Sequence, residues 1–103
     1  NHKQGYAAIE IADIAFVEAQ RTYSRIVLAK GGEHLASQPL AHYEKLLPGG
    51  QFFRVHKSFL LNLSLVKECD SGRTGFARLK NGQSLPIAAR RKAEFIRLLK
   101  AAE

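Results

Sequence analysis

The stretch Phe52-Phe53-Arg54-Val55-His56-Lys57-Ser58-Phe59-Leu60-Leu61-Asn62-Leu63 decides the fold of this chain. Apolar residues recur in it at every second position, which is the period of a β-strand with one buried face. The odd-numbered apolar row is Phe53, Val55, Phe59, Leu61, Leu63 and Leu65. Lys57 breaks that row, and an unpaired ammonium is too costly to bury. We therefore expect a turn at His56-Lys57-Ser58 that presents a basic tip between two buried strands.

Shorter signals surround this stretch. Strands are predicted over residues 7–11, 14–18, 23–29, 33–36 and 65–69. Apolar residues at helical spacing predict a short helix that ends before Pro48, with Ser37 as its N-cap and Pro39 in its first turn. A second helix is predicted after residue 88, because the apolar residues beyond it lie on one helical face. That face consists of Phe95, Leu98, Leu99 and Ala102.

A hairpin is expected between residues 75–80 and 84–87. A two-residue loop would place polar and apolar side chains on the same face. A three-residue loop over 81–83 instead pairs Leu79 with Leu85 and Ala77 with Ile87. Because a one-residue slip turns every side chain over, the apolar pattern favours the three-residue loop with a bulge.

These patterns predict a mostly β domain of about ten short antiparallel strands, with a short internal helix and a C-terminal helix. Residues 1–6 are polar and aperiodic, so we interpret them as a linker and residues 7–103 as the domain. A chain of 103 residues is one domain. It lacks Met and starts with Asn1, and we expect it to be a piece of a longer protein.

The chain is strongly basic, with 16 Lys+Arg against 9 Asp+Glu and a formal net charge of +7. Such a balance favours nucleic acid or an anionic membrane surface as partner. No apolar run approaches the ~20 residues that cross a bilayer, and no secretory signal is visible. The single Cys69 excludes an intramolecular disulfide and is compatible with a reducing compartment. We expect a cytoplasmic location and no membrane contact by this fragment.

Catalytic and metal-binding patterns are lacking in the sequence. The four histidines have no metal-ligand spacing, and one cysteine cannot complete a zinc site. No Ser, His and acid pattern suggests a nucleophile. We therefore expect no cofactor, no metal site and no enzyme activity.

Three segments resemble one known family. Phe53-Arg54-Val55-His56-Lys57-Ser58-Phe59-Leu60-Leu61-Asn62 resembles the F-x-R-x-H-[RK]-S-x-x-[VL]-N signature of the LytTR family of bacterial DNA-binding domains. Phe16-Val17-Glu18-Ala19-Gln20-Arg21-Thr22-Tyr23 resembles the family's early strand-turn-strand segment. Leu85-Pro86-Ile87-Ala88-Ala89-Arg90-Arg91 resembles the segment that leads into its terminal helix. Three ordered motifs at the expected separations make the resemblance specific.

The resemblance implies an elongated domain of small antiparallel sheets, whose loops enter DNA in place of a recognition helix. It implies sequence-specific binding of double-stranded DNA by a bacterial transcription regulator of a two-component system, with loops in successive major grooves. It also implies direct-repeat promoter sites occupied by a dimer, and an N-terminal sensor or receiver domain in the full-length protein.

Three basic clusters are the candidate DNA-binding site. They comprise Arg21, Ser24 and Arg25, then Arg54, His56 and Lys57, and finally Arg90 and Arg91. The resemblance places contacts at Ser24, at Lys57 and at an arginine after the final strand, where this chain has Ala89. Arg90 or Arg91 takes the third contact if the helix start is shifted. His56 is expected to orient the tip, and Glu18 to hold the first loop through Arg21 or Arg25.

The alternative function is a basic β-rich module that binds RNA or a protein partner. Proteins that read single strands usually display aromatic side chains on which bases stack. The six phenylalanines of this chain fall mostly on core positions. The DNA-binding interpretation is therefore favoured.

Overall fold

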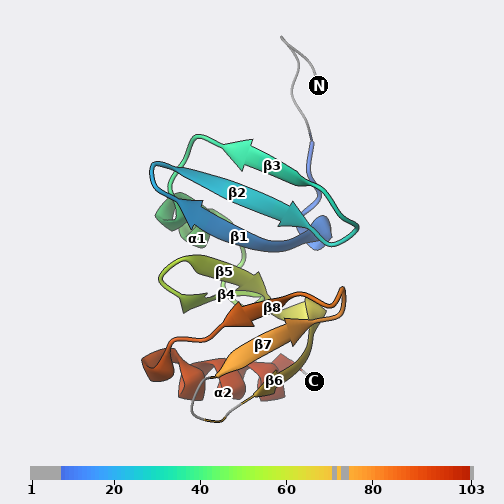
Figure 1. The fold of residues 1–103 in the computed structure, drawn as a ribbon, viewed down its shortest axis with the longest axis vertical. Coiled ribbons are helices and arrows are strands. Elements are labelled where there is room, and N and C mark those ends of the chain that lie inside the picture. The colour runs from blue at the N-terminus through green and yellow to red at the C-terminus, as the bar shows by residue number, and fades with distance from the viewer. Residues whose placement is uncertain (1–7, 71, 73–74, 103) are drawn as a thin grey trace.

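Strands dominate the computed structural model, which describes residues 8–70, 72 and 75–102 (Figure 1). The strands are β1 (Ile14–Gln20), β2 (Tyr23–Leu28), β3 (Glu33–Ala36), β4 (Phe52–His56), β5 (Phe59–Asn62), β6 (Val66–Asp70), β7 (Phe76–Leu79) and β8 (Ser84–Pro86). The helices are α1 (Leu40–Leu46) and α2 (Lys92–Ala102), and three short 3-10 turns are η1 (Ile11–Asp13), η2 (Leu63–Leu65) and η3 (Ala89–Arg91). The mostly β class is thus confirmed, with eight strands in the described part where about ten were expected. The expected linker lies outside the described residues.

The strands form two antiparallel sheets. The larger has the order β3-β2-β1-β5-β4 and the smaller the order β6-β7-β8. Figure 1 shows them one beyond the other along the long axis, with α1 beside the first and α2 beside the second. The predicted arrangement of small antiparallel sheets is therefore observed.

Two expectations for the first half of the chain are wrong. Residues 8–10 form no strand, and the chain instead closes a 3-10 turn in which the Asp13 amide donates to the Glu10 carbonyl over 2.9 Å. Ser37 is not the N-cap of α1. That position is held by Pro39, and no side chain caps the helix. The proline ring disfavours helical backbone in the preceding residue, so the helix cannot begin earlier.

The β7–β8 hairpin has the predicted loop length but a different register. Ala77 pairs with Leu85, and not with Ile87. The loop is residues 80–82, because Gly82 adopts the left-handed conformation (φ 95°) that the last position of such a loop requires. The Asn81 side chain stabilises this loop by accepting a hydrogen bond from the Gln83 amide over 2.9 Å. Each side chain still lies on the predicted face of the sheet, because the observed register differs from the predicted one by two residues.

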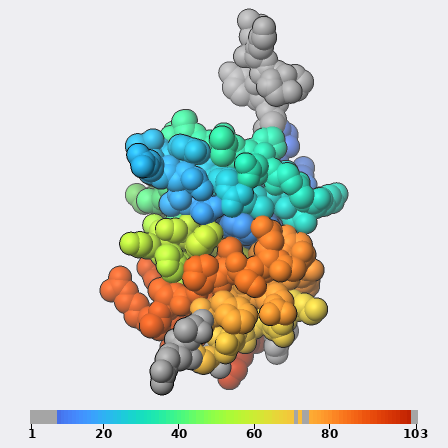
Figure 2. All heavy atoms as spheres, viewed as in Figure 1, coloured from blue at the N-terminus to red at the C-terminus, as the bar shows by residue number. Residues whose placement is uncertain are grey.

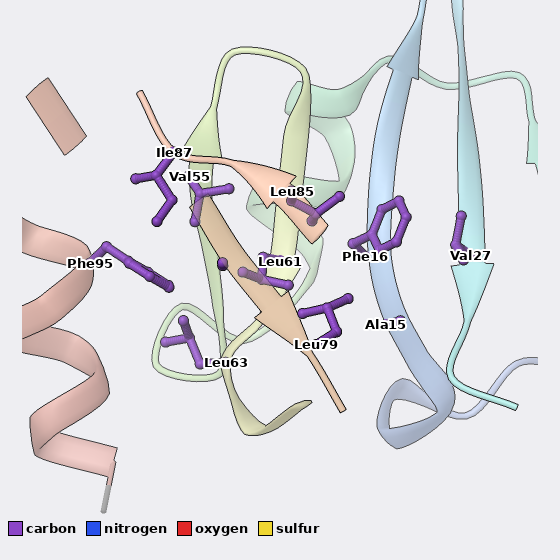
Figure 3. Close-up of a cluster of buried hydrophobic side chains, with 11 residues drawn as sticks. Ala15, Phe16, Val27, Val55, Leu61, Leu63, Leu79, Leu85, Ile87 and Phe95 are labelled. Carbon is purple, nitrogen blue, oxygen red and sulfur yellow. The ribbon is translucent and has the colours of Figure 1, made fainter. Parts of the chain in front are cut away.

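The core consists of two clusters that meet at the β4–β5 hairpin. The first joins both sheets to α2, and Figure 3 shows Phe95 of α2 directed toward the side chains of the strands. The second fills the space between the large sheet and α1. Val55 and Leu61 of the hairpin belong to the first cluster, whereas Phe52 and Leu60 belong to the second. Each fully buried aliphatic side chain contributes about 1.5–3 kcal/mol to folding.

The alternating row predicted from the sequence is confirmed. All six of its apolar side chains lie in the first cluster or pack against it. Lys57 is exposed at a turn between β4 and β5, as expected. Leu63 and Leu65 belong to η2, so the last part of the row is a 3-10 turn and not a strand.

Candidate nucleic-acid interface

Three loops lie at one edge of the molecule. They are the β1–β2 turn, the β4–β5 turn and η3, all on the left of Figure 1. The pairing explains this for the two turns: β1 runs antiparallel to β5, and Glu18 near the end of β1 faces Phe59 at the start of β5. Two strand spacings therefore separate the hairpins, or roughly 10 Å. In Figure 2 the β4–β5 turn (yellow-green) and the segment that opens α2 (red-orange) project from this edge.

Backbone hydrogen bonds fix the three loops relative to one another. The Ala19 amide donates to the Ser58 carbonyl over 2.8 Å, which joins the two hairpin turns. The Ala88 amide donates to the Val55 carbonyl over 2.8 Å, which joins η3 to the central turn. Val55 lies at a β-bulge, and a bulged residue is left out of the sheet ladder. We call this set of loops, residues 20–23, 56–59 and 89–91, the basic edge.

The β1–β2 turn presents Arg21. The turn has two residues, because Gln20 pairs with Tyr23. Arg21 is exposed and has φ 50°, the only positive φ of a non-glycine residue in the described chain. This conformation costs a residue with a β-carbon of order 1–3 kcal/mol. Thr22 beside it is also exposed and offers a hydroxyl group.

The β4–β5 turn presents Lys57 on a braced backbone. Arg54 Nη2 donates a hydrogen bond to the Lys57 carbonyl oxygen over 2.6 Å, and Arg54 Nη1 donates to Glu44 Oε1 of α1 over 2.9 Å. The Ser58 amide donates to His56 Nδ1 over 3.1 Å. Arg54 and His56 thus shape the turn, whereas the Lys57 side chain is exposed.

The third loop presents Arg90. Ala89 and Arg90 are both exposed in η3, whereas Arg91 is half-buried with its guanidinium 5.9 Å from the centre of the Phe53 ring. Ala88 provides no side-chain cap. Of the two arginines predicted to replace a contact at position 89, Arg90 is the one that points to solvent and Arg91 packs on the domain.

The other predicted residues of the first cluster are engaged within the protein. Ser24 is fully buried, and its hydroxyl donates to the Gln38 carbonyl over 2.7 Å. Arg25 forms ion pairs with Glu33 (2.6 Å) and Glu18 (2.5 Å), and these hydrogen bonds, that to Glu33 first, raise its pKa. The expected role of Glu18 is thus observed at Arg25.

Thr22 is not among the residues predicted to contact DNA, although it lies with Arg21 in the exposed two-residue β1–β2 turn. Arg21, Lys57 and Arg90 remain as the exposed cations of the basic edge that have no ion-pair partner within the described residues. Each of the three loops contributes one of them. The basic edge therefore presents a short row of unpaired positive charges on a fixed backbone.

The part of the chain that the structure describes has neither a metal-ligand cluster nor a membrane-spanning helix. No group of three or more His, Cys, Asp or Glu residues there has the geometry to hold a metal ion. No helix in that part is long and apolar enough to span a bilayer.

Comparison with known proteins gives one family and one similar structure. Residues 4–100 match the family of LytTr DNA-binding domains. The fold is similar to the LytTr DNA-binding domain of a methyl-accepting/DNA response regulator from Bacillus cereus, with a TM-score of 0.83. The two are 22% identical over 96% of this chain and 92% of the other, a likeness of fold. Among curated proteins, no sequence matches this chain.

Proposed function

This chain belongs to the LytTR family of DNA-binding domains, and from that premise we propose that its basic edge reads specific sequences of double-stranded DNA. The loops of the basic edge enter the major grooves along one face of the duplex. Arg21, Lys57 and Arg90 are the residues that contact DNA. Arg54 and His56 shape the central turn, and Arg25 holds the first hairpin through its two carboxylates.

One observation carries this proposal: each loop of the basic edge has an exposed cation that no carboxylate of the described chain neutralises. Hydrogen bonds join the loops, so the backbone positions that carry the three charges keep their spacing without a ligand. Arginine reads guanine through two parallel hydrogen bonds, and lysine can contact guanine or act as a point charge on phosphate. A major groove about 12 Å wide accepts a two-stranded turn.

The three loops differ from one another, so the basic edge reads a half-site that has a direction. On the family resemblance we propose that two copies bind in the same orientation, on a direct repeat. We propose that such promoter repeats are filled by a dimer, as part of a bacterial transcription regulator with a sensor or receiver domain. This function places the protein in the cytoplasm and involves no enzyme activity.

Selection from a random duplex library tests the proposal. The enriched sequences should contain a direct repeat.

Binding should weaken with salt, with a slope of log K against log salt near −3 to −4 per domain if about four phosphates are neutralised. Lys30→Ala and Lys100→Ala, which remove exposed charges outside the basic edge, are the matched controls and should bind nearly as the parent does. A failure to enrich any duplex, or a clear preference for single-stranded RNA, would contradict the proposal.

A further inference from the structure

The edge opposite the basic edge is hollowed. Strand β2 leads from the β1–β2 turn to the β2–β3 turn, so these two turns lie at opposite ends of the sheet (Figure 1). The β7–β8 turn lies beside the β2–β3 turn at this second edge. A hollow of about 500 Å³ separates them, with Lys30 and Gly31 on one side and Asn81 and Gln83 on the other.

This hollow continues along the molecule. A neighbouring hollow of about 240 Å³ shares Ala29 and Asn81 with the first, and a third of about 560 Å³ shares Lys80 with the second. The third extends to β6 and α2. Its aliphatic lining residues are Leu63, Val66 and Leu99. We call the three adjoining hollows the lysine groove.

The groove carries an excess of positive charge. Lys30, Lys67 and Lys80 line it and are exposed, and no carboxylate of the described residues pairs with them. The two acidic residues of its lining are already neutralised, Glu33 by Arg25 at 2.6 Å and Glu68 by Arg78 at 3.3 Å.

The position of Lys67 has a structural cause. It is the extra residue of a β-bulge, because Val66 pairs with Leu79 and Glu68 with Arg78. Bulges re-aim a side chain, and this one adds a cation to the wall of the groove.

We propose that the lysine groove is the docking site for an acidic segment of another protein that also carries apolar side chains. The charge of the groove matches carboxylates, and its lining of Leu63, Val66 and Leu99 matches aliphatic side chains. A DNA duplex is stiff and presents phosphates, so it cannot fill such a lining. Because the groove lies opposite the basic edge, the domain binds DNA and this partner at the same time.

The test uses the ¹⁵N-labelled domain and a short synthetic peptide of alternating Glu and Leu. Amide resonances of Gly31, Val66 and Lys80 should shift on titration, and those of Lys57 and Arg90 should not. The variant Lys67→Gln/Lys80→Gln should lose about fivefold or more in affinity for the peptide. Its affinity for DNA should stay within about twofold of the parent, because the two lysines lie away from the basic edge.

A matched variant, Lys57→Gln/Arg90→Gln, removes the same number of charges from the basic edge. It should lose DNA binding and keep peptide binding. The inference is overturned if the peptide shifts the basic edge, if it shifts nothing, or if both double variants weaken the peptide equally. If Lys57→Gln/Arg90→Gln keeps full DNA binding while Lys67→Gln/Lys80→Gln alone loses peptide binding, the proposed function is contradicted and the groove assignment stands.

Discussion

Arg54 holds the backbone of Lys57 without touching its side chain: Arg54 Nη2 donates to the Lys57 carbonyl oxygen over 2.6 Å, while Arg54 Nη1 donates to Glu44 on α1. The two basic residues of the turn therefore have different roles. One fixes the backbone to the body of the domain, and the other is exposed and able to contact a ligand. This separation makes the two roles testable one at a time.

Lys57→Ala should flatten the preference among operator variants by about 1–3 kcal/mol at one base pair, because the side chain reads a base there. The melting temperature should hardly change, since the side chain is exposed and makes no ion pair within the described chain. Binding to a panel of single-base operator changes at one fixed salt concentration checks this. If every affinity falls by the same factor, Lys57 contacts only phosphate.

Arg54→Ala should weaken binding and reduce the preference at the base pair that Lys57 reads, because the turn that carries Lys57 loses its brace. It should also lower the free energy of unfolding by about 1 kcal/mol through the lost hydrogen bond to the Lys57 carbonyl. Glu44→Gln is the matched control, since it removes the ion pair and leaves that carbonyl bond in place. A change of preference at a base pair other than the one affected by Lys57→Ala would instead make Arg54 a reader of sequence.

Arg90→Ala should cost about 1–3 kcal/mol of specific binding, because Arg90 is the exposed arginine of the third loop. Ala89→Arg should then tighten binding very little. Isothermal titration of both variants on the selected operator checks the pair. The opposite result, a silent Arg90→Ala and a tighter Ala89→Arg, would show that this loop lacks its contact in the natural sequence. Two silent variants would remove the third loop from the interface.

Arg21→Gly should stabilise the domain by up to about 1 kcal/mol and weaken DNA binding. Glycine adopts a positive φ without steric cost, whereas Arg21 is held there at φ 50°. Urea denaturation and a DNA titration measure the two effects. Arg21→Ala is the control: it removes the same charge but keeps the strained conformation, so it should weaken binding without the gain in stability. Unchanged DNA binding by both variants would show that Arg21 does not contact DNA.

Local patterns in the sequence predicted the elements that depend on local chemistry. The alternating row around Lys57 predicted a buried hairpin with an exposed tip, and the apolar face of Phe95 and Leu98 predicted α2. The register of β7–β8 was missed because it depends on which loop position Gly82 occupies, and the apolar pattern fits registers two residues apart equally well.

Candidate site residues were harder to predict, because their state depends on distant segments. Ser24 is buried because the chain before α1 returns over β2, where the Gln38 carbonyl accepts its hydrogen bond. Arg25 is neutralised by Glu33 only once β3 pairs with β2. The amino-acid composition does not distinguish paired from unpaired cations, because tertiary pairing decides which of them face solvent.

The β4–β5 hairpin supplies side chains to both hydrophobic clusters, Val55 and Leu61 to one and Phe52 and Leu60 to the other. Unfolding of either half of the molecule would expose apolar side chains of these same two strands to water. Local unfolding confined to one half is therefore disfavoured, and the domain should open as one cooperative unit. Loss of either cluster would then disturb the hairpin to which the other loops of the basic edge are hydrogen-bonded.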